Sequence, residues 1–326
     1  MAPTLMTILA LGILLVPLAT DAQQPGKVPT IGVLWFADPV TNAPYLNAFR
    51  EGLRELGYAE GRNVAVEYRF AGGNRNVLTT HAAELVRLRV DVIFVGGSAT
   101  LEAARRATKT IPIVMASFND PVGEGLVASL ARPGGNITGL SWLSPELSEK
   151  RLELLKEVSQ RVSRVAVLVD QSDSSAALEL RGLQTAAHAL DVRLHIFDVR
   201  NADGFASAFA AIEKAHPDAL VAVDNLLTTT NRTQIADFAL KNRLPLISEG
   251  RAFADSGALM TYGPRGYDMF KRAAMYVDRI FRGAKPGDLP IEQPTRFELV
   301  INLKTAKALG VTIPQSVLLR ADDVIR

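Results

Sequence analysis

The feature that most constrains this chain is a series of strand and helix patterns that occurs twice in the same order. Each half contains four short apolar strand patterns, separated by segments whose apolar spacing is typical of amphipathic helices. The strand patterns of the first half lie at 30–36, 63–70, 92–95 and 111–116, and those of the second half lie at 165–169, 192–197, 218–223 and 244–247. Strands that alternate with helices predict parallel sheets covered on both faces. We therefore predict an α/β fold with two doubly wound, Rossmann-like, parallel-sheet lobes.

The segment 111–146 separates the two halves. A strand pattern at 111–116 leads into turns rich in Pro and Gly, and an extended run at 136–142 follows. This segment is predicted to be the first crossing between the lobes.

The C-terminal patterns are too few for a third lobe. A strand at 258–262 and a long helix at 267–281 are followed by a strand at 297–301 and a short helix at 303–309. The chain is therefore expected to return to lobe one and to finish on lobe two, so that several crossings form a hinge. The predicted boundaries are 28–142 plus about 262–288 for lobe one, and 143–261 plus about 289–326 for lobe two.

The N-terminal residues have the composition of an export signal. Residues 5–19 are apolar and uncharged, but the run is shorter than the roughly 20 residues that a spanning helix needs. Small residues at 20 and 22 precede Gln23, as at a cleavage site. We predict that 1–22 is a secretory signal peptide and that the protein is periplasmic or extracytoplasmic; a retained membrane anchor is the alternative.

Composition excludes several classes of function. The chain has no cysteine, so it has neither disulfides, nor thiolate metal sites, nor a lipidated Cys at the end of the leader. A net charge of +2 provides no field that would attract nucleic acid. The dinucleotide, phosphate-loop and zinc-protease motifs and the nucleophile elbow are absent from the sequence. We therefore predict no catalytic residue, no metal site and no cofactor.

The candidate site follows from the strand ends. Ligands of open parallel sheets bind beyond the carboxyl ends of the strands, and two facing lobes would share one cleft there. In lobe one the candidate ligand-binding residues are Trp35, Phe36, Ser98, Ala99, Thr100, Ser117, Asn119 and Asp120. In lobe two they are Asp170, Asp224, Asn225 and Glu249, and Tyr262 lies near a crossing.

Each of these residue types has a ligand-binding interpretation and a structural one. The hydroxyls and free N–H groups of 98–100 precede a predicted helix and suit a carboxylate, but they also suit an ordinary helix cap. Asp224 could bind an ammonium group or cap the helix that follows it. Trp35 and Phe36 could stack on a ligand or belong to the core.

Several stretches resemble a known family. The stretch from Asp120 to Gly139, with its Asp-Pro-Val-Gly-Glu-Gly and Arg-Pro-Gly-Gly-Asn-Ile-Thr-Gly runs, is similar to the central signature of the ABC-transporter substrate-binding proteins that include the tryptophan- and tyrosine-binding proteins. Further similar stretches lie at 49–58, 152–156, 301–314 and 321–325.

The resemblance implies a type I periplasmic-binding-protein fold, export, and a partner permease with a separate ATPase. In family members that bind aromatic amino acids, a hydroxyl-bearing loop like 98–100 holds the carboxylate, and an Asp-Asn pair like Asp224-Asn225 follows a lobe-two strand. The chain differs from the tryptophan binders at 36–39 and 170–173. The resemblance therefore leaves the solute open.

The predicted function is a non-enzymatic, monomeric solute receptor of an ABC importer. It would capture a small molecule, such as an amino acid or a related carboxylate, in the cleft between the lobes. The first alternative is an enzyme on the same scaffold that acts on a nucleotide or sugar-nucleotide, because a fold alone does not decide function. The second alternative is a ligand-sensing regulatory domain.

Overall fold

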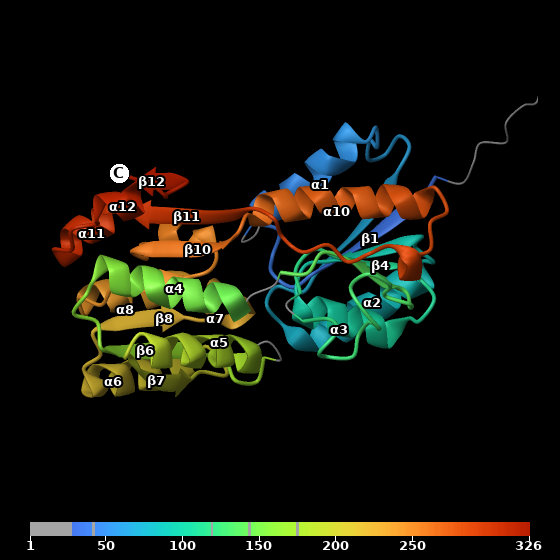
Figure 1. Ribbon diagram of the computed structural model, residues 1–326. Coiled ribbons are helices and arrows are strands. Elements are labelled where there is room, and N and C mark those ends of the chain that lie inside the picture. Colours follow the sequence, from blue (N-terminus) through green and yellow to red (C-terminus); the bar gives the residue numbers. More distant parts are fainter. Residues whose placement is uncertain (1–27, 41–42, 119, 143–144, 174–175) are drawn as a thin grey trace, which may run out of the picture.

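The computed structural model describes residues 28–40, 43–118, 120–142, 145–173 and 176–326. The predicted signal peptide at 1–22 and the candidate residue Asn119 lie outside the described residues. Two α/β lobes lie side by side, each with a central sheet between layers of helices (Figure 1). The predicted fold class, two doubly wound lobes, is confirmed.

The first sheet consists of five parallel strands in the order β2-β1-β3-β4-β5. Its strands are β1 (Thr30–Trp35), β2 (Ala65–Phe70), β3 (Val92–Val95), β4 (Ile113–Met115) and β5 (Ile137–Gly139). Its helices are α1 (Ala43–Glu55), α2 (Arg75–Arg87), α3 (Ser98–Ala107) and α10 (Gly266–Phe281). Helices α1 and α10 cover one face, while α2 and α3 cover the other (Figure 1). Along β1, Val33 packs toward α1 and α10 and Leu34 toward α2 and α3, as a strand buried on both faces requires.

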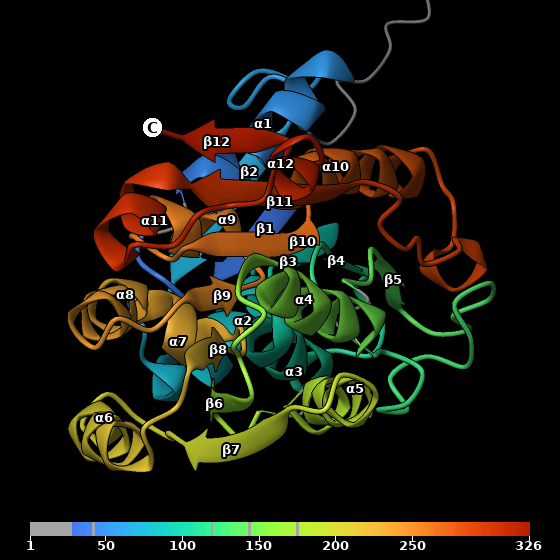
Figure 2. The same ribbon diagram turned by 60° about the vertical axis from the view of Figure 1, so that its left-hand side comes forward.

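The second sheet has the order β12-β11-β10-β9-β8-β6-β7, and β10 and β11 form its antiparallel pair (Figure 2). Its strands are β6 (Arg164–Val169), β7 (Arg193–Asp198), β8 (Ala219–Ala222), β9 (Leu246–Ser248), β10 (Met260–Pro264), β11 (Phe297–Asn302) and β12 (Asp323–Ile325). One face packs on α4 (Pro145–Val158), α5 (Ala176–Ala189), α11 (Leu303–Leu309) and α12 (Gln315–Leu318). The other face packs on α6 (Gly204–Ala215), α7 (Leu226–Thr230), α8 (Arg232–Lys241) and α9 (Arg251–Asp255).

Within the described residues the chain passes between the sheets three times: after β5, between β10 and α10, and before β11. The first and third crossings run alongside each other. The N–H of Ser141 donates to the carbonyl of Glu292 at 2.8 Å, and the N–H of Glu292 donates to the carbonyl of Gly139 at 3.0 Å. The segment before the third crossing includes the 3₁₀ turn η1 (Pro286–Asp288). Paired crossings of this kind form the hinge that the sequence predicted.

Two predicted boundaries were wrong. The helix that was predicted to follow residues 98–100 begins three residues earlier, at Ser98, because the loop ends at Gly97, which has a φ of 116°. The strand expected at 258–262 is β10, Met260–Pro264, because its antiparallel partner continues the ladder to the pair Pro264 and Phe297. Ser98, Ala99 and Thr100 therefore form the first turn of a helix, and Tyr262 lies inside a strand.

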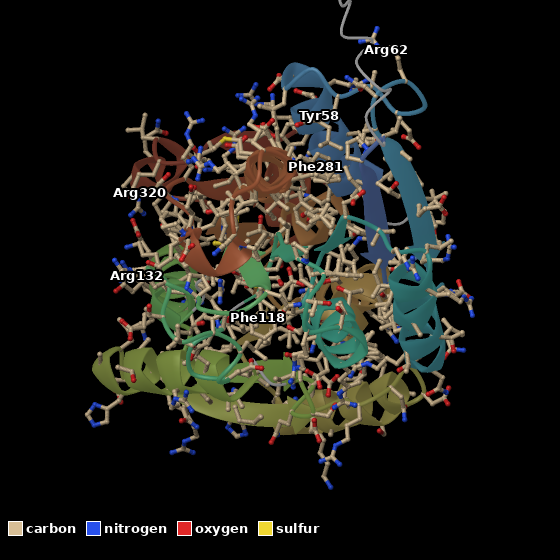
Figure 3. The ribbon with its side chains drawn as sticks, turned by 90° about the vertical axis from the view of Figure 1, so that its right-hand side faces the viewer. Tyr58, Arg62, Phe118, Arg132, Phe281 and Arg320 are labelled. Carbon is tan, nitrogen blue, oxygen red and sulfur yellow. The ribbon has the colours of Figure 1, made fainter. Side chains whose placement is uncertain are left out.

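Close packing of α10 on α1 attaches the returning segment to lobe one. Gly52 lies at the contact, where a Cβ would stand 2.2 Å from the carbonyl oxygen of Lys271. The Lys271 ammonium bonds to Glu51 at 2.7 Å and to Glu55 at 2.8 Å. At the end of the helix pair, Tyr58 and Phe281 pack edge to face with ring centroids 5.6 Å apart (Figure 3).

We predict that Gly52→Ala destabilises the protein by about 1–3 kcal/mol, because the added methyl group must push two backbones apart. The free energy of unfolding from urea titration measures this change. Gly135→Ala is the matched control, since a Cβ at Gly135 meets no atom within 4 Å. Equal stabilities of the two variants would contradict the prediction.

Candidate functional site

A cavity of about 170 Å³ lies between the lobes, at the carboxyl ends of parallel strands from both sheets. Most of the predicted site residues lie on its wall. They are Trp35, Phe36, Ser98, Ala99, Thr100 and Ser117 from lobe one, and Asp224, Asn225 and Glu249 from lobe two. The topology of the two sheets thus brings together residues up to 214 positions apart, from Trp35 to Glu249.

Three other candidates, Asp120, Asp170 and Tyr262, do not line the cavity, and each makes a contact elsewhere. The carboxylate of Asp120 accepts the N–H of Gly123 at 2.7 Å and closes a turn. The carboxylate of Asp170 accepts the N–H of Ser172 at 2.9 Å. Tyr262 packs its ring against Phe297, with centroids 6.2 Å apart. These three residues stabilise local structure.

The lobe-one wall of the cavity is aromatic. Trp35 is only 3% exposed and packs edge to face on Phe270, with ring centroids 5.6 Å apart. Tyr45 stacks on the same ring at 4.9 Å. Phe118 also lines the cavity and lies in the interior of the molecule (Figure 3). A wall of this composition suits the apolar part of a ligand.

The N-terminus of α3 faces the same cavity. The first intrahelical bond runs from the N–H of Leu101 to the carbonyl of Gly97, 3.1 Å, so the N–H groups of residues 98–100 have no partner within the helix. The Thr100 hydroxyl donates to the carbonyl of Gly97 at 2.9 Å. Free N–H groups and the helix dipole make this end a site for an anionic group.

Asn225, which follows β8, caps α7, whereas the sequence analysis considered Asp224 for that cap. Its side-chain oxygen accepts the N–H of Thr228 at 2.9 Å, and its own N–H donates to the Thr228 hydroxyl at 3.0 Å, which forms a capping box. Its Nδ2 atom is buried and has no hydrogen-bond partner among the described residues. The amide therefore has a donor available for a ligand in the cavity.

Asp224 is held by neighbouring groups of lobe two. Its carboxylate accepts the Thr229 hydroxyl and the N–H of Gly250, the latter at 3.0 Å. Burial raises the pKa of Asp224. A carboxylate in this position binds a cationic group strongly, because little water competes for it.

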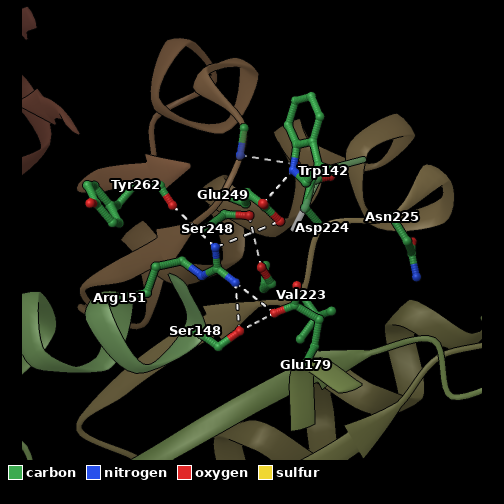
Figure 4. Close-up of polar contacts among 12 residues, drawn as sticks. Trp142, Ser148, Arg151, Glu179, Val223, Asp224, Asn225, Ser248, Glu249 and Tyr262 are labelled. Carbon is green, nitrogen blue, oxygen red and sulfur yellow. Dashed lines mark hydrogen bonds and ion pairs between the residues drawn. The ribbon is translucent and has the colours of Figure 1, made fainter. Parts of the chain in front are cut away.

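The buried guanidinium of Arg151 lies behind the carboxylates of Asp224 and Glu249 (Figure 4). Arg151 in α4 is 3% exposed, and its Nη2 lies 2.7 Å from the Glu179 carboxylate and 2.9 Å from the Ser148 hydroxyl. Its Nη1 donates to the carbonyl of Tyr262 at 3.2 Å and lies 3.8 Å from the Glu249 carboxylate. Arg151 therefore connects helices α4 and α5 with the residue after β9 and with the middle of β10.

Glu249 connects this cluster to the first crossing. Its carboxylate, 3% exposed, accepts the indole N–H of Trp142. Burial raises the pKa of Glu249 to about 8, with further increases from Glu179 and Asp224, and the opposing effects of Arg151 and Trp142 do not cancel this rise.

Sequence reasoning missed Tyr45, Trp142 and Phe270 on the wall, and Arg151 and Glu179 behind it. Arg151 and Glu179 could have been identified from the sequence, because each interrupts the apolar face of its own helix. Leu147, Leu154 and Leu155 surround Arg151 at helical spacing, while Ala176 and Leu183 flank Glu179, and all of them are buried. A charged residue on such a face requires a buried partner.

We predict that Arg151→Met lowers the free energy of unfolding by about 3–5 kcal/mol, because it leaves buried carboxylates without their cation. Lys150→Met on the same helix is the matched control. Lys150 pairs with Glu153 at 2.7 Å but is 39% exposed, so we expect a loss of at most about 1 kcal/mol. Denaturant unfolding of both variants measures the difference, and similar losses would show that the Arg151 cluster adds nothing beyond a surface pair.

Two further observations concern metal binding and membrane-spanning helices. In the part of the chain that the structure describes, no group of three or more His, Asp or Glu side chains could hold a metal ion. Over the same residues, no helix has the length and hydropathy needed to cross a membrane.

Comparison with known proteins identifies the family. The model of the ABC transporter substrate binding protein family matches residues 31–325. A tyrosine-binding protein of Clostridioides difficile (strain R20291) is 26% identical over 293 residues, which cover 90% of this chain and 83% of that protein. An ABC domain from Streptococcus pneumonia in complex with L-Trp has a TM-score of 0.86 at 26% identity, over 91% of this chain and 99% of that one. A conserved domain protein from Vibrio cholerae has a TM-score of 0.86 at 30% identity, over 91% of this chain and all of that one (100%).

These similarities also confirm the type I periplasmic-binding-protein architecture. The matched family and the tyrosine-binding relative are substrate-binding proteins and not enzymes. The chain belongs to the ABC transporter substrate-binding protein family.

Proposed function

We propose that this chain is the exported receptor of an ABC importer and captures an L-amino acid with an aromatic or large apolar side chain. It delivers this solute to a permease that works with a separate ATPase. The observation that carries the proposal is the composition of one cavity. An aromatic wall, a helix N-terminus and buried carboxylates surround about 170 Å³ of space.

The three chemical parts of an amino acid each have a complementary part of the wall. The α-carboxylate suits the N–H groups of residues 98–100 and the free Nδ2 of Asn225, which approach from opposite lobes. The ammonium group suits the Asp224 carboxylate. The side chain suits the aromatic rings of Trp35, Tyr45 and Phe270.

The size of the cavity favours one small solute. A cavity of about 150 Å³ holds a benzene molecule, so about 170 Å³ is close to what an amino acid needs and too small for a nucleotide or sugar-nucleotide. The relatives support the same choice, since one is a tyrosine-binding protein and another was solved in complex with L-Trp.

Contacts from both lobes also explain how binding would be signalled. A carboxylate held by α3 of lobe one and Asn225 of lobe two draws the lobes together, because only the closed arrangement makes both contacts. The crossings that pair Ser141 with Glu292 allow this movement without breaking either sheet. The closed form is the one that the permease would recognise.

We predict that the protein is exported, cleaved before Gln23 and monomeric, and that an aromatic L-amino acid stabilises it. The full 326-residue chain is expressed in a Gram-negative host and purified from the periplasm, and native mass spectrometry gives its N-terminus and oligomeric state. A thermal-shift screen then tests the standard amino acids one at a time. A ligand present at a hundredfold excess over its Kd raises the free energy of unfolding of the protein by about 2.7 kcal/mol. If no amino acid raises the Tm, the proposed ligand class is wrong.

We predict that Asp224→Asn raises the Kd for the best amino acid about hundredfold or more, because it removes the negative charge that faces the ammonium group. Isothermal titration calorimetry measures the Kd. Asp120→Asn is the matched control and should change the Kd less than about twofold, since Asp120 closes a turn outside the cavity. An unchanged Kd in Asp224→Asn would mean that Asp224 only supports the Thr229 and Gly250 contacts.

A further inference from the structure

The indole of Trp35 lies directly on the backbone of Gly96 at the wall of the cavity. Trp35 is the last residue of β1, and Gly96 follows the neighbouring strand β3. A Cβ at Gly96 would stand 2.8 Å from Cζ3 and 2.9 Å from Cη2 of Trp35. Carbon atoms at such distances repel each other, because their favourable separation is about 3.5–4.0 Å. The six-membered ring of the indole therefore fills the space that a side chain at position 96 would need.

Neighbouring rings hold Trp35 in this position. Its indole packs edge to face on Phe270, with ring centroids 5.6 Å apart, and lies 6.2 Å from the ring of Phe94. Phe94 is in turn stacked on Phe49 at 3.8 Å, and Trp35 itself is only 3% exposed. Closely packed interiors leave few voids into which a ring could turn. Trp35 is therefore a rigid part of the wall, which does not move aside for a larger ligand.

The volume of the cavity leaves room for one ring of a solute. Both Trp35 and Gly96 line the cavity, which measures about 170 Å³. An apolar cavity of about 150 Å³ holds one benzene molecule. An amino acid must also place its carboxylate and ammonium groups in this space. A second fused ring would therefore need the volume that the indole of Trp35 occupies.

The hollow that adjoins the cavity does not suit a second ring. It measures about 490 Å³ and meets the cavity at Ser98, Ala99 and Phe118. Beyond these residues, its wall carries the charged side chains of Glu102, Arg105, Arg106 and Glu124. An apolar ring placed there would take water away from charged groups, which is unfavourable. The limit set at Trp35 is therefore not relieved through this opening.

We propose that Trp35, lying on Gly96, is a specificity-determining residue that limits the solute to an apolar side chain with at most one six-membered ring. The solute class is then phenylalanine, tyrosine and amino acids with smaller apolar side chains, and tryptophan is excluded. The relatives leave this choice open, since one is a tyrosine-binding protein and another was solved in complex with L-Trp. The inference rests on the proposed function, because it assumes an amino acid as the solute.

Binding to the unmodified protein provides the first test. Isothermal titration calorimetry measures the Kd of L-tryptophan, L-phenylalanine, L-tyrosine and L-leucine. L-Tryptophan should bind at least about tenfold more weakly than the tightest of the three smaller amino acids, because an oversized group does not fit a closely packed site. Equal or tighter binding of L-tryptophan overturns this inference and leaves the proposed function standing.

Two substitutions then open and refill the space over Gly96. Trp35→Phe keeps an aromatic ring in the cluster but removes the outer part of the indole, so the Kd of L-tryptophan relative to the tightest smaller amino acid should improve at least about tenfold. Adding Gly96→Ala to Trp35→Phe places a methyl group in the opened space, and this ratio should return toward that of the unmodified protein. A residue that only stabilises the lobe would not produce such a gain and its reversal.

Phe94→Leu is the matched control for lost aromatic packing. Phe94 belongs to the same ring cluster and is fully buried, but it does not line the cavity. This variant should leave the ratio between L-tryptophan and the smaller amino acids within about twofold of its original value. The inference is overturned if Trp35→Phe changes the ratio no more than Phe94→Leu does, or if Gly96→Ala does not reverse the gain. Failure of every L-amino acid to bind the unmodified protein overturns the proposed function and this inference together.

Discussion

The buried guanidinium of Arg151 holds together the parts of lobe two on which the site depends. Through it, helices α4 and α5 are joined to the carbonyl of Tyr262 and to Glu249 at the cavity. Glu249 in turn accepts the indole N–H of Trp142, whose own backbone N–H donates to the carbonyl of Phe118 in lobe one at 2.7 Å. Removing a charge from water is costly, and this cost is offset because both terminal nitrogens of the guanidinium have partners on the surrounding elements. The cluster thus orders the floor of the cavity and the start of the hinge.

The two lobes contribute unlike surfaces to one cavity. Lobe one presents aromatic rings that pack on each other, while lobe two presents carboxyl groups and a free amide donor. The helix N-terminus at Ser98 adds a positive potential on the aromatic side. An amphoteric solute with an apolar side chain matches this distribution, and neither lobe alone surrounds it. In the proposed function, closure of the lobes and recognition of the solute are therefore the same event.

Much of this structure could be predicted from the sequence, and the failures have common physical causes. The repeated strand patterns predict two parallel sheets, and the rule about strand ends correctly brings Trp35, Ser98, Asp224 and Glu249 to one cavity. Asp170 also follows a strand, yet its carboxylate turns back onto the N–H of Ser172. Sequence position alone cannot distinguish these outcomes, because short polar side chains bond to their own backbone as readily as to a ligand.

The sequence by itself determined the alternation of strands and helices, the duplication of the lobe and the family. These follow from the spacing of apolar residues and from motifs that are local along the chain. Only the tertiary structure decided which face of α10 brings Phe270 to the wall, that Trp142 bonds to Glu249, and that Arg151 meets Glu179. Those contacts join residues that are 28 or more positions apart, and they depend on how helices rotate and pack on a sheet. Local spacing does not encode that rotation, so the chemistry of the cavity became visible only in three dimensions.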